Sequence, residues 1–318
     1  MKILDIHSRI AVCSRSFSRN QTLRTELLSR FPCSKFNDAG VSLRDESLVE
    51  FLAGCDGAII ALEDITESVL RQLPTLRVIG KYGVGINNID LQACLDHSVE
   101  IGWRGGVNAS AVAELAITMI LSLIRLVPES QDIARRGGWK QVVGRQLSGK
   151  TVGIVGMGNV GKKLIDLLAP FDVDVLANDI EFDDEFASIR GVAKVELASL
   201  LRDSDVVSLH VPLTHKTRKL ISKKELQTMR PGSILVNTAR GGVVDEASAL
   251  VALAEGRLAG LGFDVLSEEP PSNTEWFANP RVMVTTHIGG SSDDAILNMG
   301  RAAIDGLINH KPANLIVG

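Results

Sequence analysis

The chain has 318 residues, of which 45% are hydrophobic and 23% are charged, and it includes 29 glycines. This length is enough for two domains of ordinary size, and the composition is typical of a soluble globular protein rich in α/β elements. The formal net charge of −4 and the pI of about 5.9 provide no excess of basic groups. We therefore expect neither nucleic acid nor an anionic membrane as a partner.

The cysteines and the apolar segments favour a cytoplasmic protein. The N-terminal residues MKILDIHSR are too polar for the core of a signal peptide. The longest apolar run, Ala111–Val127, contains Glu114 and Arg125 and is too short and too charged to span a bilayer. No two cysteines form a C-x-x-C pair, so we expect reduced thiols and no metal site. The four cysteines are Cys13, Cys33, Cys55 and Cys94.

Short apolar runs alternate with helical patterns from one end of the chain to the other. Strands are predicted at Ile10–Cys13, Gly57–Ile60, Arg77–Gly80, Val99–Ile101, Val152–Val155, Val173–Ala177, Val206–Leu209, Ser233–Asn237, Leu261–Asp264 and Val282–Thr285. Helical spacing of apolar residues occurs between them, for example at Gln21–Arg30, Lys162–Leu168, Ala198–Leu201 and Ala247–Glu255. This alternation predicts an α/β fold whose parallel sheets are covered by helices on both faces.

Two long helical segments interrupt the alternation and mark the expected domain boundaries. Ser110–Leu126 is apolar over most of its surface, and Ser291–Asn309 opens with a cap-like Ser-Ser-Asp-Asp. We expect them to be crossovers between two doubly wound domains. The first, flavodoxin-like and discontinuous, would comprise residues 1–103 completed by 291–318, and the second would comprise residues 104–290.

A glycine-rich turn indicates that the second domain binds a dinucleotide. Gly156, Gly158 and Gly161 form a G-x-G-x-x-G between an apolar strand and an amphipathic helix. Asp179 ends the next strand, 18 residues after Gly161, where the acidic ribose ligand of a Rossmann-like unit belongs. A carboxylate there favours NAD over NADP, because it accepts hydrogen bonds from the ribose and repels a 2′-phosphate. A glycine-rich turn without any cofactor is the alternative.

Three polar residues follow three later strands of the same domain. They are Arg240, Glu269 and His287. The carboxyl ends of parallel strands lie at one edge of the sheet, so these three side chains are expected at the edge where the cofactor binds. Each alone has a structural explanation: a strand-end arginine, a solvated Glu-Glu-Pro-Pro loop and a turn histidine. Together they supply a cation for a carboxylate, a proton donor and a carboxylate that orients it. His210 is a weaker acid/base candidate, because it has no matching carboxylate.

Several stretches in register resemble the D-2-hydroxyacid dehydrogenase family, which includes phosphoglycerate dehydrogenase. They are KYGVGINNID, NASAVAEL, GMGNVG, HVPLTHKTR, NTARGGVVDE, FDVLSEEPP and THIGG, within about Arg77–Asn309. The resemblance implies a His287 acid/base, a Glu269 partner and an Arg240 substrate anchor. It also implies that Asp264 holds the nicotinamide amide of NAD, and that backbone N–H groups of Gly83–Gly85 bind the substrate carboxylate.

The resemblance extends to further ligand contacts. For the cofactor it implies Gly156, Gly158, Asn159, Val160, Gly161, Asp179, His210, Val211, Pro212, Thr238, Ala239, Asp264 and Gly289. For the 2-hydroxy or 2-oxo acid substrate it implies Lys81, Tyr82, Gly83, Val84, Gly85, Asn108 and Arg240.

The chain departs from phosphoglycerate dehydrogenases in its first domain. Those enzymes usually place arginines there for the phosphate, whereas this chain has Ala61 in the corresponding loop and only Lys81 in an evident position. Arg104, Arg135 and Arg136 are the other cations that could reach the site. We therefore expect a substrate with one carboxylate and a small or moderate, weakly charged tail.

Two other functions are compatible with the same motifs. A corepressor-like scaffold that senses NADH has this fold and keeps the three polar residues, and a phosphite-type oxidase keeps the histidine and the glutamate. Formate dehydrogenases of similar fold have Gln in place of Glu269, which argues against that chemistry. The apolar Ser110–Leu126 helix, followed by Trp139, predicts a homodimer, since family members pair through this region.

Overall fold

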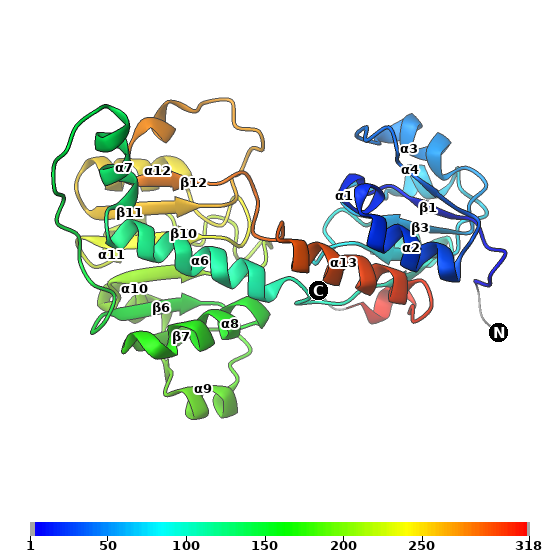
Figure 1. Ribbon diagram of the computed structural model, residues 1–318. Helices are drawn as coiled ribbons and strands as arrows, with labels where there is room; N and C mark the ends of the chain where they lie inside the picture. The colour runs from blue at the N-terminus through cyan, green and yellow to red at the C-terminus, as the bar shows by residue number, and fades with distance from the viewer. Residues whose placement is uncertain (1–3, 317–318) are drawn as a thin grey trace. The chain divides into compact units, whose positions relative to one another are not determined.

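The computed structural model describes residues 4–316 and shows an α/β protein with two parallel sheets. Its contacts divide the chain into a first unit, residues 1–108 with 290–318, and a second unit, residues 109–289. The predicted fold class is confirmed, including the first domain assembled from both ends of the chain. Each unit has its own sheet (Figure 1), and the buried hydrophobic clusters lie within the units.

The first unit is built on a five-stranded parallel sheet with the order β2-β1-β3-β4-β5. Its strands are β1 (Ile10–Val12), β2 (Ser34–Phe36), β3 (Gly57–Ile60), β4 (Val78–Lys81) and β5 (Glu100–Gly102). Its helices are α1 (Arg15–Arg19), α2 (Gln21–Arg30), α3 (Asp45–Leu52), α4 (Glu67–Leu70), α5 (Leu91–Asp96), α13 (Asp293–Gly306) and the 3₁₀ turn η3 (Ala313–Leu315). From β1 the chain moves to β2 on one side, then to β3 on the other.

Helix α13 joins the first unit because two strand glycines let it approach the sheet. A Cβ on Gly80 would lie 2.4 Å from the Ala303 carbonyl oxygen, and one on Gly102 would lie 2.0 Å from that of Gly306. Any larger residue would push the helix away from β4 and β5. The red C-terminal helix in Figure 1 therefore packs with the blue and cyan elements of the N-terminal part.

The second unit has a seven-stranded parallel sheet with the order β12-β11-β10-β9-β6-β7-β8. Its strands are β6 (Thr151–Val155), β7 (Asp174–Asn178), β8 (Ala193–Lys194), β9 (Val206–Leu209), β10 (Ser233–Asn237), β11 (Leu258–Phe263) and β12 (Val282–Val284). Its helices are α6 (Ala109–Ile124), α7 (Val127–Arg135), α8 (Asn159–Leu168), α9 (Asp184–Arg190), α10 (Leu197–Asp203), α11 (Lys223–Thr228), α12 (Glu246–Ala254) and the 3₁₀ turns η1 (Ala169–Phe171) and η2 (Glu275–Ala278).

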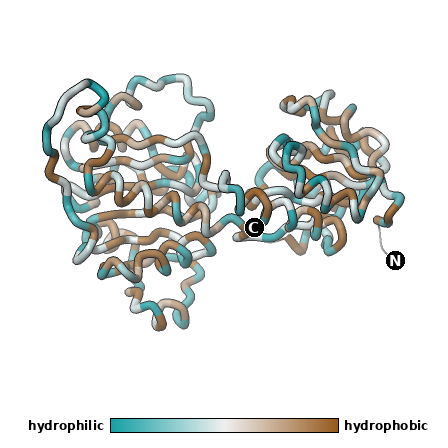
Figure 2. Tube along the Cα trace, in the orientation of Figure 1, coloured by the Kyte–Doolittle hydropathy of each residue, from teal (hydrophilic) through white to brown (hydrophobic). Residues whose placement is uncertain are grey.

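Both faces of the second sheet are covered, so its central strands are buried along their whole length. Val206 and Ile234 belong to the core beneath α6 and α8, whereas Val207 and Leu235 belong to the opposite core with α11 and α12. This side-to-side alternation explains why these strands appear in the sequence as continuous apolar runs. Figure 2 shows the corresponding hydrophobic residues along the strands.

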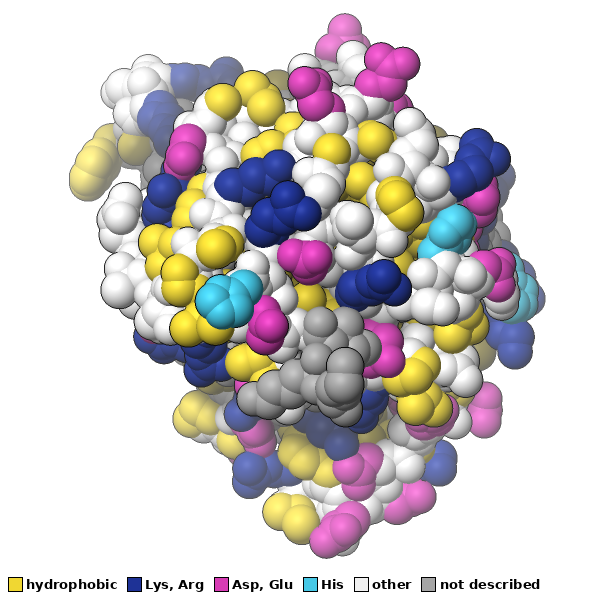
Figure 3. Space-filling model, turned by 90° about the vertical axis from the view of Figure 1, so that its right-hand side faces the viewer, with side chains coloured by type: hydrophobic (Ala, Val, Ile, Leu, Met, Phe, Trp, Pro, Cys, Tyr) yellow, Lys and Arg dark blue, Asp and Glu magenta, His cyan; other side chains and the backbone are white. Residues whose placement is uncertain are grey.

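The apolar segment predicted as one helix, Ser110–Leu126, is bent at its end. Helix α6 stops at Ile124, Leu126 has a left-handed backbone with φ of 54°, and α7 continues at an angle of 67° to α6. Within residues 4–316 no single helix is long and apolar enough to cross a membrane, although α6 and α7 together meet that criterion by length and composition. On the face drawn in Figure 3, acidic and basic side chains are interspersed.

Candidate active site

The glycine turn lies between β6 and α8, at the point where the chain order of the second sheet reverses. Gly156 has φ of 95°, and a Cβ there would lie 2.7 Å from the His210 carbonyl carbon. Gly161 packs against the turn, since its Cβ would lie 2.2 Å from the Gly156 oxygen. A Cβ on Gly158 would meet nothing within 4 Å. The middle glycine thus leaves open space, which suits the pyrophosphate of a dinucleotide.

Asp179 follows β7 and is turned toward the glycine turn. Its carboxylate accepts hydrogen bonds from the backbone N–H groups of Met157 and Glu181. A carboxylate has about four acceptor positions, so it retains capacity for a ribose hydroxyl. Asn159 and Val160 form the first turn of α8, where backbone N–H groups have no partner within the helix. These contacts fit an NAD molecule whose pyrophosphate lies at the start of α8.

Two buried polar atoms at the neighbouring strand ends have no hydrogen-bond partner within the described part of the chain. They are Nδ1 of His210, after β9, and Oγ1 of Thr238, after β10. His210 Nε2 is 2.9 Å from the Ser208 hydroxyl, and burial lowers the pKa of His210 to about 4. The imidazole is therefore neutral at ordinary pH. Unpaired buried polar groups are uncommon, and they favour a polar ligand beside these strands.

The loop after β10 explains the arginine and the two glycines of NTARGG. A Cβ on Gly241 would lie 1.8 Å from the Leu266 oxygen, so this glycine lets the loop contact the one after β11. Gly242 has φ of 80°, a conformation that glycine adopts without strain. Arg240 is half-buried, and Nη1 donates to the Ala239 oxygen at 2.7 Å. Burial lowers the pKa of Arg240, and the negative charge of Glu269 opposes that effect.

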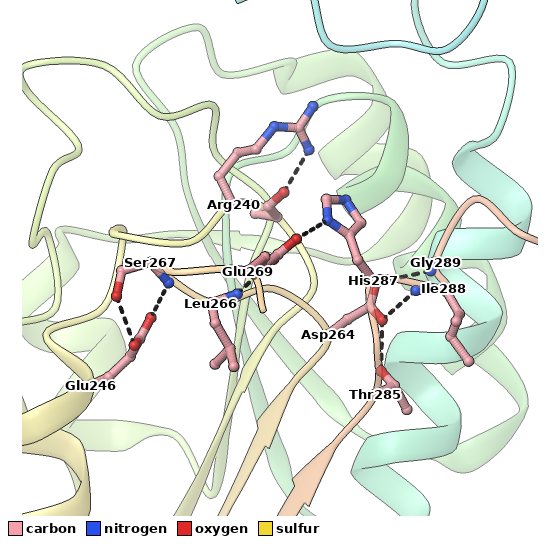
Figure 4. Close-up of polar contacts among 11 residues, drawn as sticks. Arg240, Glu246, Asp264, Leu266, Ser267, Glu269, Thr285, His287, Ile288 and Gly289 are labelled. Carbon is pink, nitrogen blue, oxygen red and sulfur yellow. Dashed lines mark hydrogen bonds and ion pairs between the residues drawn. The ribbon is translucent and has the colours of Figure 1, made fainter. Parts of the chain in front are cut away.

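Glu269 and His287 form a hydrogen-bonded pair beside Arg240 (Figure 4). The distance from His287 Nδ1 to Glu269 Oε2 is 2.7 Å, and Glu269 Oε1 accepts from the Leu266 N–H at 2.8 Å. Both side chains are partly exposed, at 48% for His287 and 38% for Glu269. Nε2 of His287 makes no hydrogen bond to any residue between 4 and 316, which leaves it available to a substrate.

Asp264 holds the His287 loop in an unusual conformation. Its Oδ1 accepts from the Thr285 hydroxyl at 2.6 Å and the Ile288 N–H at 2.7 Å, and its Oδ2 accepts from the Gly289 N–H at 2.8 Å. The Asp264 carbonyl accepts from the His287 N–H at 2.9 Å. His287 itself has φ of 56°, which is strained for a residue with a side chain. The sequence analysis missed this role of Asp264 and the contribution of Thr285.

The expected substrate residues of the first unit lie mostly at the carboxyl end of β4. Gly83 has φ of 106°, and Trp103 donates from Nε1 to the Val84 oxygen at 2.9 Å. Lys81 is 3% exposed and its ammonium group donates to the Ala61 oxygen. Asn108 is the last residue of the first part of this unit, and the Gly83 and Gly85 backbone follows β4 directly.

The remaining expected cofactor residues continue the loops already described. Val211 and Pro212 follow His210, and Ala239 follows Thr238 with its N–H donating to Asn237 Oδ1 at 3.0 Å. Gly289 is the last residue of the second unit and is buried. Among the described residues, no group of three or more His, Cys, Asp or Glu side chains could hold a metal ion.

A glycine turn between strand and helix, a carboxylate after the next strand and a histidine–glutamate pair on the same sheet are typical of NAD-dependent dehydrogenases. Residues 117–289 match the family model described as "D-isomer specific 2-hydroxyacid dehydrogenase, NAD binding domain". The glyoxylate reductase of Thermococcus litoralis is 34% identical over 283 residues, covering 85% of this chain and 86% of that protein. A D-3-phosphoglycerate dehydrogenase of Archaeoglobus fulgidus is 35% identical over 77% of this chain, which spans only 47% of that protein.

Solved structures agree with the sequence comparisons. A glyoxylate reductase from Paecilomyes thermophila has a TM-score of 0.83 at 25% identity, with 94% of each chain covered. The pyruvate reductase of Chlamydomonas reinhardtii has a TM-score of 0.81 at 27% identity, with 96% of each chain covered. The chain belongs to the D-isomer specific 2-hydroxyacid dehydrogenase family. It is an NAD-dependent 2-hydroxyacid dehydrogenase or reductase, which confirms the predicted family, enzyme class and cofactor.

Proposed function

We propose that the chain interconverts a small 2-oxo acid and its D-2-hydroxy acid, with His287, Glu269 and Arg240 as the catalytic residues. The observation that carries the proposal is the 2.7 Å contact between His287 Nδ1 and Glu269 Oε2, beside Arg240. Relatives named glyoxylate reductase and hydroxypyruvate reductase, at 34% and 30% identity, support a small substrate.

The turn at Gly158 and the Asp179 carboxylate would hold NADH, which would supply the hydride for reduction of the carbonyl carbon. Glu269 accepts a hydrogen bond from Nδ1 of His287, so the ring presents its other nitrogen, Nε2, to the substrate oxygen. Protonated Nε2 donates a proton to the alkoxide that forms, and the Glu269 charge stabilises the imidazolium before transfer. The Arg240 guanidinium binds the substrate carboxylate, because its planar fork matches two carboxylate oxygens. In the oxidative direction the same histidine accepts the proton.

The proposal also includes the residues expected to bind the cofactor and the substrate. The open space at Gly158, the Asp179 carboxylate and the unpaired atoms of His210 and Thr238 support NAD binding along the edge of the second sheet. The positive φ of Gly83 supports a loop whose backbone N–H groups bind a carboxylate. The four cysteines are unpaired, in keeping with a cytoplasmic location.

A steady-state assay with a panel of 2-oxo acids tests the proposal. Glyoxylate, pyruvate and hydroxypyruvate would each be offered with NADH and, in parallel, with NADPH. We expect turnover of at least one acid with NADH and a lower kcat/KM with NADPH. Tight NADH binding with negligible turnover of every acid would instead favour the corepressor-like scaffold.

A further inference from the structure

Besides the loop after β4, the first unit has another position at which its fold favours ligand binding. In the strand order β2-β1-β3-β4-β5 the chain direction reverses between β1 and β3. Ligands of open parallel sheets bind at the carboxyl ends of the strands beside such a reversal. The segment that follows β1 here is Cys13–Ser16, and it includes Arg15, the first residue of α1.

The backbone on both sides of Arg15 is held firmly. Ser14 is 3% exposed and its hydroxyl accepts from the Phe17 N–H at 3.3 Å. Phe17 is completely buried, and Ser18 donates from its hydroxyl to the Val12 oxygen at 3.4 Å. The Arg15 side chain is exposed and makes no ion pair or hydrogen bond within residues 4–316. The hydrogen bonds of Ser14 and Ser18 thus flank a guanidinium that has no polar partner in the described part of the chain.

Direct contacts connect this segment to the loop after β4 that we expect to bind the substrate. The Ser16 hydroxyl lies 2.6 Å from the Tyr82 hydroxyl. The Phe17 and Tyr82 rings meet edge to face, with centroids 6.0 Å apart. The residues immediately after Arg15 therefore contact the residue immediately before Gly83. All of these contacts lie within the first unit.

Lys81, the first-domain cation in an evident position for a charged tail, has a different environment. Lys81 is buried at 3% exposure, and its ammonium group donates to the Ala61 carbonyl oxygen. The nearby Glu63 carboxylate accepts from the Ala61 N–H at 2.7 Å, so it is engaged within its own loop. Arg15 is an exposed cation at this reversal point, and no sequence motif pointed to it.

We infer that Arg15 binds a second anionic group, a carboxylate or a phosphate, on the tail of the 2-oxo acid. The inference rests on the proposed function, in which the loop after β4 binds the carboxylate next to the reacting carbonyl. The guanidinium offers a bidentate contact to either anion. The protein would then prefer 2-oxo acids with a charged tail, which replaces our expectation of a weakly charged one.

Two matched substrate pairs test the inference. Hydroxypyruvate and phosphohydroxypyruvate differ by one phosphate, and pyruvate and oxaloacetate differ by one carboxylate. Wild type should favour the charged member of at least one pair by about tenfold or more in kcat/KM. Arg15→Gln should abolish that preference and change kcat/KM for the uncharged member by less than about twofold. Arg15→Lys should restore part of it, because a point charge remains without the bidentate fork.

The control variant is Arg30→Gln, which removes an exposed arginine at the far end of α2. It should leave the kcat/KM ratio of both substrate pairs unchanged.

Turnover of uncharged acids without any preference for a charged tail would overturn the inference and leave the proposed function standing. So would a preference that survives in Arg15→Gln. If no acid is turned over, the proposed function fails. The thermal shift caused by phosphohydroxypyruvate in the NADH complex then tests Arg15 alone: loss of the shift in Arg15→Gln supports it, and an equal shift contradicts it.

Discussion

His287 combines two features that a proton donor needs: a partner for one ring nitrogen and a fixed backbone. Glu269 engages Nδ1 at 2.7 Å, and the Asp264 network holds the loop on both sides of the ring. The left-handed backbone of His287 is a local cost that these contacts offset. Such a conformation is difficult to foresee from the letters THIGG, because it depends on a carboxylate 23 residues earlier in the chain.

His287→Ala should abolish turnover and leave NADH binding almost unchanged. The ring is proposed to move a proton and its hydrogen-bond partner is Glu269, not the glycine turn, so kcat should fall by about 10²-fold or more while NADH still binds. Parallel measurement of kcat and of the NADH dissociation constant by fluorescence checks this. A variant that keeps more than half of the wild-type kcat would exclude His287 as the acid/base.

Glu269→Gln should lower kcat for reduction by about tenfold or more. Gln can keep the contact with Nδ1, but it has no charge to stabilise the ring while His287 donates its proton to the substrate. Steady-state kinetics of wild type and variant with the same 2-oxo acid and NADH provide the test. An unchanged kcat in the variant would remove Glu269 from the mechanism.

The glycines at the junction of β6 and α8 have different roles. Gly158→Ala should fold normally, because its Cβ enters open space, but should weaken NADH binding by about tenfold where the pyrophosphate must approach. Gly161→Ala is the matched control. Its Cβ would meet the Gly156 oxygen, so it should lower stability by about 1–3 kcal/mol.

Thermal unfolding and NADH titration of both glycine variants separate the two effects. Loss of stability in Gly158→Ala with unchanged NADH affinity would contradict the assignment of this turn to the cofactor.

His210, at the end of β9, should make the free energy of unfolding depend on pH. Burial lowers the pKa of His210 to about 4 from 6.5, so the unfolded chain binds a proton between these values and the folded chain does not. Stability should therefore fall as pH decreases from 6.5 and level off below about 4. In His210→Gln this component is absent, so the difference in Tm between wild type and variant should change across that window. If the difference in Tm between wild type and His210→Gln stayed constant from pH 7 to pH 4, His210 would not be the source of this pH dependence.

For the whole molecule, we predict a homodimer formed through α7 and the segment that follows it. No residue of α7 is buried, and Trp139 and Val143 are 98% and 90% exposed. Large apolar side chains this exposed favour contact with another protein surface. Light scattering at micromolar concentration should give twice the mass of one chain.

The double variant Trp139→Ser, Val143→Ser should shift this protein toward the monomer. Ile189→Ser, which removes a side chain that is 70% exposed on α9, should not. A monomeric wild type would rule out the dimer.

The sequence predicted the buried strands well and the short polar ones poorly. Ser233–Asn237 and Val206–Leu209 were predicted with the observed bounds, because strands covered on both faces are apolar throughout. β2 (Ser34–Phe36) and β8 (Ala193–Lys194) were missed, since edge strands with exposed residues have no such run. The residues of the glycine turn were recognised by spacing, whereas the surroundings of Arg15 and Lys81 depend on packing.

The proposed reaction can be tested by following the transferred hydride. NADH deuterated at the transferred position would be reacted with the fastest prochiral 2-oxo acid of the panel, and the product analysed for isotope and configuration. We predict a D-2-hydroxy acid with deuterium at C2, and no such product from His287→Ala. An L product, or a reduced product without deuterium, would contradict the proposed reaction.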